Sequence, residues 1–334
     1  MKYKCIVVAK RGPPENLQIV ERDLRDPSSR EVRVKVLACG VCGPDVQTRY
    51  GLSPFAPKPP YDAGSSMVGT VDAVGSAVRH AAPGDHVAAY PAFGGYSEYV
   101  YLPESRLIFV PSDLDPVPAA PLVLNYLTAY QVMHRRAKVT TGGKALIVGA
   151  SGGCGTAFLD LGRLAGLKMY GLASASKSST LTQFGAIPID YRKQDFVEVI
   201  RDAEPDGLDY IFDGMGGDYL KRAFPLLRRG GVLVEYANPL SFGGILRSLG
   251  WVLVLSLLPN GRRVKGYGAG MSLFYRKPFL EDWATLFRLL QEGKIRPVIS
   301  GQFPLLEAAR ANALLESGQV VGNLVLVTGD QGRG

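Results

Sequence analysis

The sequence predicts an α/β protein with two domains, one β-rich and one built on a doubly wound parallel sheet. Three observations support this prediction. The chain has 334 residues, which corresponds to about two domains by length. Short apolar runs separated by glycine, proline and acidic turns fill its first third and are typical of β-strands. From about residue 118, apolar strands alternate with helical segments, which is the pattern of a parallel sheet.

The β-rich domain is predicted over residues 1–117, and residues 270–334 are expected to return and complete it. Strands are predicted from the apolar runs at 3–9, 32–41, 67–75, 86–90 and 96–102. In the returning segment we expect amphipathic helices at 279–293 and 305–318, and strands at 295–304 and 322–329.

The parallel-sheet domain is predicted over residues 118–269 and opens with a helix at 119–137. Strands are expected at 145–148, 168–174, 187–190, 208–217 (with its turn), 232–237 and 264–268. The helices between them are expected at 156–167, 176–186, 195–203 and 219–231, and glycines such as Gly185 mark their ends.

A glycine-rich turn is the strongest functional signal in the chain. It joins a buried strand to an amphipathic helix, as in a dinucleotide-binding crossover. Gly152 would let backbone N–H groups approach a pyrophosphate, and Gly155 would let the helix pack closely on the strand. The alternative is a glycine turn without a ligand. The predicted phosphate-binding residues, at the start of the helix, are Gly149, Ser151, Gly152, Gly153, Cys154 and Gly155.

The end of the next strand predicts NADPH rather than NADH as the cofactor. An NAD-binding fold carries an acid about 20 residues past the glycine turn, where it binds the ribose hydroxyls. This chain has no acid at 172–177, and Ser174 and Lys177 would accept a 2′-phosphate that an acid would repel. The alternative for Lys177 is a solvated lysine on a helix surface.

Composition and charge bound the other function classes. The net charge of +8 is scattered, so we expect no nucleic-acid partner. Few cysteines and no export signal predict a cytoplasmic protein. The apolar segment 245–258 is too short to span a membrane, which takes about 20 residues. A buried helix, an apolar dimer contact or a shallow interfacial segment would each explain it.

Three further motifs give the chain a family resemblance. They are Gly84-Asp-His-Val87, Gly94-Gly-Tyr-Ser-Glu-Tyr99 and Leu127-Thr-Ala-Tyr130. With the domain order they resemble the medium-chain dehydrogenase/reductase superfamily, in particular its zinc-free quinone oxidoreductase branch, over essentially the whole chain. The resemblance implies a GroES-like β-rich catalytic domain, a Rossmann cofactor domain, a homodimer, and contact of Lys177 and Tyr191 with the NADPH phosphate and adenosine.

The resemblance raises the question of zinc. Zinc-dependent relatives have a cysteine ligand that matches Cys42, and a His-Glu pair where this chain has Ser65 and Ser66. Serine hydroxyls are poor zinc ligands, and one Cys-X-X-Cys pair, Cys39 and Cys42, is a weak metal signal. We therefore expect no metal, and we interpret the two cysteines as small core or pocket residues, with a redox pair as the alternative.

Without a metal to polarise a carbonyl, the favoured reaction is hydride transfer from NADPH to an activated C=C, as in an enone or enoyl compound, or to a quinone. Among the remaining residues that the layout implies, Asp45 is expected to orient rather than to act as general acid. The predicted site residues are catalytic Asp45, Tyr50 and Asn125; substrate-pocket Cys42, Tyr61 and Tyr126; and cofactor-binding Thr128, Ala237, Asn238, Gly268 and Asn323.

Two other functions stay open at this point. The protein could be a nucleotide-binding protein that associates with a membrane or a partner and turns over little. It could also be a relative of the zinc alcohol dehydrogenases that has lost its metal.

Overall fold

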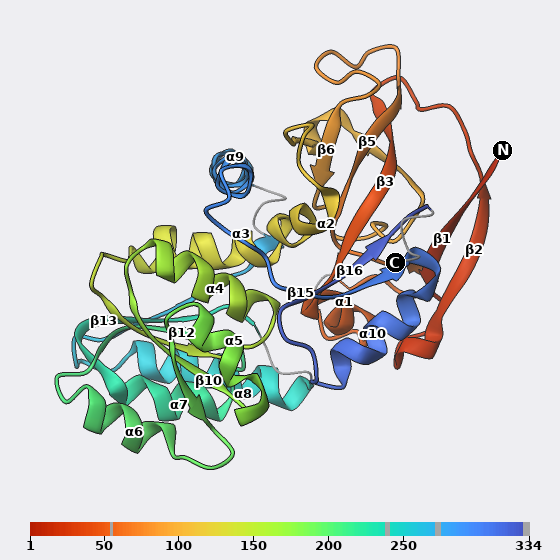
Figure 1. Cartoon of the computed structure of the whole chain (residues 1–334). Helices are drawn as coiled ribbons and strands as arrows, with labels where there is room; N and C mark the ends of the chain where they lie inside the picture. Colours follow the sequence, from red (N-terminus) through yellow and green to blue (C-terminus); the bar gives the residue numbers. More distant parts are fainter. Residues whose placement is uncertain (54–55, 238–240, 271–274, 330–334) are drawn as a thin grey trace. The chain divides into compact units, whose positions relative to one another are not determined.

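The computed structural model describes residues 1–53, 56–237, 241–270 and 275–329 (Figure 1). The chain folds into two units. Unit 1 comprises residues 1–125 and 273–334, and unit 2 comprises residues 126–272. Unit 1 is β-rich and unit 2 carries a parallel sheet, so the predicted fold class is confirmed.

Unit 2 is organised around parallel strands in the order β11-β10-β9-β12-β13-β14. Successive strands are added on one side of β9 and then on the other, so the strand order reverses there. Ligands of doubly wound sheets bind at the carboxyl edge beside such a switch point. The strands are β9 (Lys144–Val148), β10 (Lys168–Ala173), β11 (Ile187–Asp190), β12 (Leu208–Asp213), β13 (Leu227–Glu235) and β14 (Arg263–Gly266).

Helices cover both faces of this sheet. On one face, α6, α7 and α8 share a core with strand residues such as Leu146, Ile211 and Leu233. On the other face, Phe158 of α4 stacks on Phe212 of β12 with ring centroids 4.7 Å apart. The helices are α3 (Asn125–Tyr130), continued by a π-helical turn over Gln131–Ala137, α4 (Gly153–Leu164), α5 (Ser178–Gln183), α6 (Phe196–Ala203), α7 (Asp218–Ala223) and α8 (Phe242–Ser256).

Unit 1 contains two sheets. The larger runs β15-β16-β3-β5-β6-β8, with β7 also paired to β3, and the smaller runs β2-β1-β4. The strands are β1 (Lys2–Val8), β2 (Leu17–Asp23), β3 (Glu31–Val41), β4 (Tyr61–Asp62), β5 (Met67–Val74), β6 (His86–Ala89), β7 (Tyr99–Pro103), β8 (Ile108–Phe109), β15 (Ile299–Pro304) and β16 (Asn323–Val327).

The returning segment belongs to the sheet of unit 1. β16 pairs antiparallel with the end of β3, placing Leu326 opposite Cys39, and β15 pairs parallel with β16. The helices of this unit are α1 (Gly43–Arg49), α2 (Pro116–Ala119), α9 (Lys277–Gln291) and α10 (Ala308–Glu316). The indole N–H of Trp283 on α9 donates to Val123 O at 3.0 Å, so α9 is fixed to the preceding segment of its own unit.

Two predicted helices differ from the structure. The helix expected at 119–137 is divided, because a short 3₁₀ turn around Pro121 precedes α3. The helix expected at 219–231 ends at Ala223, and Pro225 lies in a 3₁₀ turn before β13 begins at Leu227. Proline lacks the N–H that a helix interior needs, which explains both interruptions.

The apolar segment noted at 245–258 forms most of α8. Its helix begins at an N-cap serine, Ser241, whose Oγ accepts from Gly244 N at 3.1 Å. In the part of the chain that the structure describes, no helix combines the length and apolar character that crossing a membrane requires.

Close contact between α4 and the turn before it depends on Gly155. A Cβ built on Gly155 would lie 2.2 Å from Gly149 O and 2.5 Å from Ala150 C, so no side chain fits there. At Gly152 a Cβ would meet only Gly149 O, at 3.7 Å, and φ is −77°. Within the sequence GASGGCG, packing therefore requires glycine at position 155 but not at position 152.

We expect Gly155→Ala to lower the free energy of unfolding by about 2–3 kcal/mol, because the new methyl group must push α4 away from β9. Urea denaturation measured by circular dichroism checks this. The matched control is Gly152→Ala, which should change the free energy by less than about 1 kcal/mol. Equal losses in the two variants would contradict the packing role given to Gly155.

Candidate functional site

The glycine turn places the first turn of α4 at the carboxyl edge of the sheet. Gly149 has a φ of +81°, which glycine adopts without strain, and Gly152 is the N-cap residue of α4. The first N–H groups of a helix lack intrahelical partners and attract a phosphate. Open space at Gly152 leaves room for such a group. The turn therefore fits the pyrophosphate of a dinucleotide.

Cations lie together beyond the ends of β10 and β11. Ser174 follows β10 and is buried, and Lys177 is half-buried. Burial lowers the pKa of Lys177, and the positive charge of nearby Arg192 lowers it further. The Arg192 guanidinium lies 5.9 Å from the ring centroid of Tyr191, which follows β11. Two mutually repelling cations beside a hydroxyl group form a donor set that fits a phosphate monoester.

A pair of buried carboxyl groups lies at the same edge, on the ends of β12 and β13. Asp213 and Glu235 are register partners in the parallel pairing of these strands. Asp213 Oδ1 accepts from Met215 N at 2.7 Å and from Gly216 N at 2.9 Å, while its Oδ2 has no partner within the described residues. Burial raises the pKa of Asp213 to about 6, against these two hydrogen bonds.

Glu235 connects the strand end to α8. Burial raises its pKa to about 7, a hydrogen bond from Ser248 opposes the rise, and the charge of Asp213 adds to it. Ser248 Oγ also accepts from Gly217 N at 2.7 Å. Glu235, Ser248 and the turn after β12 thus form one buried network.

The turn that this network holds faces the glycine turn. The side chain of Met215 lies 3.6 Å from the position of a Cβ on Gly149. Behind it, the hydroxyl of Tyr236 lies 2.4 Å from the Cβ position of Gly214, so a side chain at residue 214 would require the Tyr236 ring to move. Met215 is half exposed and lies beside the glycine turn.

In unit 1, Asp45 lies in a hydrogen-bonded cluster at the start of α1. Its Oδ2 accepts from Cys42 N at 2.9 Å and from the hydroxyl of Tyr96 at 3.0 Å. Tyr96 reaches it because its ring packs against Gly64, where a Cβ would lie 2.3 Å from Cδ1 of the ring. Burial raises the pKa of Asp45, and the two donors oppose the rise. This arrangement suits the orienting role expected for Asp45.

The residues at the position of a zinc site lie close together. From the position of a Cβ on Gly40, Cys42 Sγ is 3.3 Å away and Ser66 Oγ is 3.5 Å away. Ser65 and Ser66 are buried, and the Cys39 thiol is hydrogen-bonded to Gly95 O. Among the described residues, no three histidine, cysteine or carboxylate side chains come together in a way that could hold a metal ion.

Tyr50 lies at the end of α1 beside a buried ion pair. Its hydroxyl donates to Glu316 Oε2 at 3.0 Å, and 38% of the residue is exposed. Glu316 also binds the buried guanidinium of Arg49, which holds α10 against α1. The predicted catalytic hydroxyl is thus engaged by a carboxylate that has a structural partner.

Asn125 and Asn323, which were predicted for different roles, bind each other. Asn125 Nδ2 donates to Asn323 Oδ1 at 2.7 Å, and Asn323 Nδ2 donates to Val298 O at 3.0 Å. Both side chains are buried. These two hydrogen bonds fix the orientation of the Asn125 amide. Its Nδ2 faces Asn323, so its Oδ1 points away from Asn323.

The two tyrosines predicted for the substrate pocket differ in position. Tyr61 is half-buried, its hydroxyl has no partner in the described part of the chain, and burial raises its pKa to about 12. Tyr126 is fully buried, and its hydroxyl donates to Asp160 Oδ2 on α4 at 3.0 Å. Tyr126 therefore packs α3 against α4.

The other predicted cofactor residues are distributed along unit 2. Thr128 is buried on α3, Ala237 is half-buried after β13, and Gly268 is exposed after β14. Tyr191 is 44% exposed. Asn238 lies outside the described residues.

Four residues of these sites were missed in the sequence prediction. Asp213 and Glu235 have a detectable signal, because each is an acid that directly follows an apolar run, 210–212 and 232–234 respectively. Arg192 follows Tyr191 directly, but its proximity to Lys177 depends on the pairing of β10 with β11. Tyr96 lies in the Gly-Gly-Tyr motif, and only the fold brings it to Asp45.

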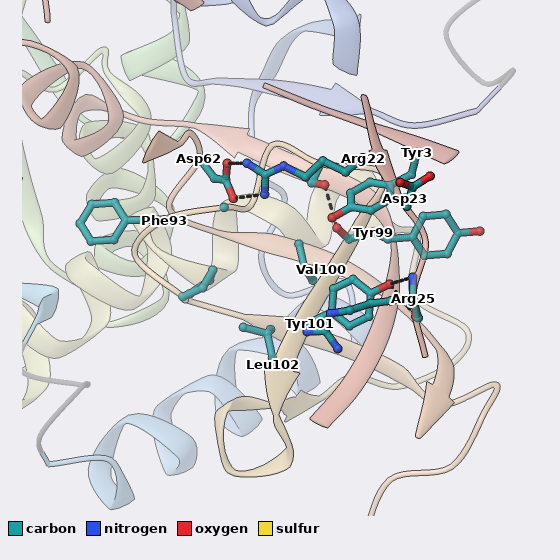
Figure 2. A pocket seen from close by; sticks show the side chains of 13 residues that line it. Tyr3, Arg22, Asp23, Arg25, Asp62, Phe93, Tyr99, Val100, Tyr101 and Leu102 are labelled. Atoms are coloured by element: carbon teal, nitrogen blue, oxygen red, sulfur yellow. Dashed lines mark hydrogen bonds and ion pairs between the residues drawn. The ribbon is translucent and has the colours of Figure 1, made fainter. Parts of the chain in front are cut away.

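A further pocket of about 400 Å³ opens on unit 1 and contains none of the predicted site residues. Figure 2 shows the Arg22 guanidinium reaching Asp62, and Arg25 beside Tyr101. The two hydrogen bonds from Arg22 to Asp62 are 2.7 and 2.5 Å long, and the guanidinium carbon of Arg25 lies 4.0 Å from the ring centroid of Tyr101. Arg22 is paired with Asp62, and Arg25 with Glu31, so we assign the pocket no role.

Comparison with known families matches two models to this chain. Residues 28–112 match the alcohol dehydrogenase GroES-like domain, and residues 184–326 match the zinc-binding dehydrogenase family. The first match lies in unit 1, and the second extends from unit 2 into the returning segment.

Similar proteins cover nearly the whole chain. The rat synaptic vesicle membrane protein VAT-1 homolog is 30% identical, over 98% of this chain and 85% of that protein. A 2-haloacrylate reductase from a Burkholderia species is 30% identical, over 96% of this chain and 98% of that protein. The crystal structure of Escherichia coli quinone oxidoreductase complexed with NADPH has a TM-score of 0.88 and 27% identity, covering 97% of this chain and 99% of that one.

We expect Glu235→Gln to stabilise the protein at alkaline but not at acid pH. The pKa of Glu235 is raised in the folded state, so folding favours the protonated form and stability falls as pH rises from the unfolded pKa to about 7. Glutamine keeps the bond to Ser248 and cannot ionise. The gain should reach the order of 2 kcal/mol at about pH 8 and vanish near pH 4.

Urea denaturation of both proteins across this pH range measures the difference. Glu198→Gln, at an exposed position on α6, is the control and should show no pH-dependent gain. A constant difference between wild type and Glu235→Gln at all pH values would mean that Glu235 does not change its protonation in this range.

Proposed function

The chain belongs to the medium-chain dehydrogenase/reductase superfamily and is an oxidoreductase, and we propose that it is a zinc-independent, NADPH-dependent reductase. Its substrates are an activated C=C, in an enone or enoyl compound, or a quinone. The observation that carries this proposal is the basic site beyond β10, where residues 172–177 contain no acid and Lys177 lies near Arg192. Relatives named as a 2-haloacrylate reductase and a quinone oxidoreductase support the reaction class.

The choice of NADPH rests on charge. Lys177 and Arg192 are close enough for the charge of one to lower the pKa of the other. A doubly charged 2′-phosphate would relieve their repulsion, whereas the ribose hydroxyls of NADH would not. Ser174 adds a hydroxyl donor in place of the acid that NAD-binding folds use. The similar quinone oxidoreductase from Escherichia coli was crystallised with NADPH, which supports NADPH as the cofactor proposed for this chain.

The choice of substrate rests on the residue types at Ser65 and Ser66. Zinc acts as a Lewis acid on a carbonyl oxygen when it is held by cysteine, histidine or carboxylate ligands. Two serines stand here in place of the His-Glu pair of the zinc-dependent relatives. A conjugated acceptor needs less polarisation, because hydride addition at its β-carbon moves the charge onto a distant oxygen that water or a hydrogen-bond donor can stabilise.

When bound, NADPH supplies the hydride. The first turn of α4 would hold its pyrophosphate, and Lys177, Arg192 and Ser174 would hold the 2′-phosphate. Asp45 would fix the start of α1 through Cys42 N and Tyr96. These residues position rather than react, so their contribution is orientation of the reacting groups.

The amide of Asn125 would present a fixed polar group to the reaction site, because Asn323 holds its Nδ2. We leave Tyr50 out of the proposed chemistry. Its hydroxyl hydrogen is directed to Glu316, so the proton that completes the reduction is assigned to solvent. A homodimeric state and a cytoplasmic location remain predictions from the resemblance and from the cysteine content.

Lys177→Glu should weaken NADPH binding by about 10- to 100-fold, because it replaces a charge-assisted hydrogen bond by repulsion. The dissociation constant of NADH should stay the same. Both constants are measured by the fluorescence of the bound dinucleotide, so the result does not depend on turnover. Arg192→Glu is expected to act in the same direction.

The matched control for this test is Arg201→Glu, a charge reversal at an exposed position on α6. It should leave both dissociation constants unchanged. If wild-type protein bound NADH more tightly than NADPH, or if Lys177→Glu weakened both dinucleotides equally, the assignment of the 2′-phosphate site would be wrong.

Zinc independence predicts that treatment with a chelator leaves NADPH oxidation unchanged. Purified protein is dialysed against chelator, and its rate with a quinone, an enone and a 2-enoyl thioester is compared before and after. Elemental analysis of the same sample supplies the control. Stoichiometric zinc, with activity lost on its removal, would refute the proposed mechanism.

A further inference from the structure

The outer side of α8 carries an exposed apolar stripe. Its large side chains recur at spacings of three or four residues, which places them on one face of a helix. Each of the five is between 54% and 74% exposed. The stripe consists of Phe242, Leu246, Leu249, Leu253 and Leu257. Over the 15 residues of α8 it extends for about 22 Å.

The opposite side of α8 packs against the core of unit 2. The exposed stripe is therefore a second apolar face of the helix and not the face that packs on the core. Leu255 is buried in the core that α8 shares with α6 and α7, and Trp251 packs against that core. Ser248 Oγ accepts from Gly217 N at 2.7 Å. Figure 1 shows α8 lying beside α7 along one side of the unit. The helix already buries one face and presents a second apolar face outward.

Basic residues and no acids accompany the stripe. From residue 236 to residue 272 the sequence contains Arg247, Arg262, Arg263 and Lys265, and neither aspartate nor glutamate. Arg247 pairs with Asp218 on α7. The other cations lie beyond the carboxyl end of α8 or on β14.

A basic cluster, defined as Arg229, Arg262 and Arg263, forms where the chain leaves α8. Arg229 Nε lies 3.5 Å from the Cβ position of Gly261, and Arg263 donates to Gly230 O at 2.8 Å. No ion pair joins the three guanidinium groups to a carboxylate within the described residues. Arg262 Nε donates to Leu227 O at 2.6 Å, which is a neutral acceptor, so this contact leaves the positive charge of the cluster in place.

We propose that α8 docks unit 2 on the surface of a bilayer that contains anionic lipid. The apolar stripe would enter the boundary between headgroups and acyl chains, and the basic cluster would bind the negative headgroups. A long apolar face with flanking arginines is the composition of helices that lie in the membrane interface. Each basic residue near such a surface adds to the attraction.

Charge distinguishes this occupant from a second copy of the chain. A symmetric dimer buries the same patch of both subunits. The segment 236–272 offers no carboxylate to the basic cluster of a partner copy. An anionic bilayer supplies an apolar layer for the stripe and negative charge for the basic cluster, so it complements both parts of this surface.

Flotation with lipid vesicles tests the proposal. Purified protein is mixed with vesicles of phosphatidylcholine, with and without phosphatidylglycerol, at low and at high salt. We expect binding only to the vesicles that contain phosphatidylglycerol, and weaker binding at high salt, because surface charges are screened.

Two sets of variants separate the contributions. The double variant Leu249→Glu/Leu253→Glu changes the stripe, and Arg262→Glu/Arg263→Glu changes the basic cluster. Each should lower the partition coefficient at least about tenfold. The matched control is Leu280→Glu/Leu306→Glu, at leucines of unit 1 that are each 38% exposed. It should bind as the wild type does.

Folding and cofactor binding are read out independently. All variants should keep the circular dichroism spectrum and the NADPH dissociation constant of the wild type, since α8 contributes no proposed cofactor contact. If the double glutamate variant fails to fold, the single variant Leu253→Gln takes its place.

Three outcomes would overturn the proposal. The first is that folded wild-type protein floats with neither type of vesicle, or with both equally. The second is that the stripe variant binds as well as wild type. The third is a wild-type dimer that becomes a monomer in the stripe variant, as measured by light scattering, which would assign α8 to a second copy.

Discussion

The contact between the first turn of α4 and the backbone of the glycine turn is the constraint on which unit 2 depends. Gly155 lies so close to Gly149 O and Ala150 that no side chain fits between them. This contact brings the helix start directly to the end of β9, the strand at which the sheet order reverses. Its N–H groups consequently lie at the same edge as Lys177, Asp213 and Glu235, and backbone packing would thus create the proposed phosphate site.

Unit 1 also contains a glycine whose missing side chain allows a close contact, in this case with an aromatic ring. A Cβ on Gly64 would overlap the ring of Tyr96, and Gly64 has a φ of +92°. The ring fills the space that a side chain would occupy, and its hydroxyl reaches Asp45 at the start of α1. In both units a missing Cβ allows a close approach, and the approach sets the position of a polar group. Substitutions at such glycines therefore act on function through packing.

Much of this architecture could be predicted because it depends on local patterns. Alternating apolar strands and helices indicated the parallel sheet, and all six of its strands are present. β2 escaped prediction because none of its residues is buried, so it lacks a sustained apolar pattern. The helix expected to reach residue 231 failed at Pro225, a local signal that was outweighed by the apolar residues around it.

Side-chain sites were harder to predict because they join distant segments. Asn125 and Asn323 are separated by 198 residues, and only the pairing of β16 with the unit 1 sheet brings them together. The hydrogen bond from Tyr126 to Asp160 joins α3 to α4, and no local pattern in the sequence predicts that pairing. The order of strands and helices in the sequence predicted which segments lie in the same sheet. The direction of each side chain depends on packing between segments, which the sequence pattern does not show.

The buried carboxyl pair connects the two surfaces of unit 2 that carry function in our interpretation. Asp213 holds the turn at Met215, which lies against the glycine turn, and Glu235 reaches Ser248 on α8. The same turn bonds to Ser248 through Gly217 N. Ionisation of Glu235 places charge inside this network without a cation to neutralise it among the described residues. The nucleotide edge and the base of α8 therefore share one set of hydrogen bonds, and a change in protonation acts on both together.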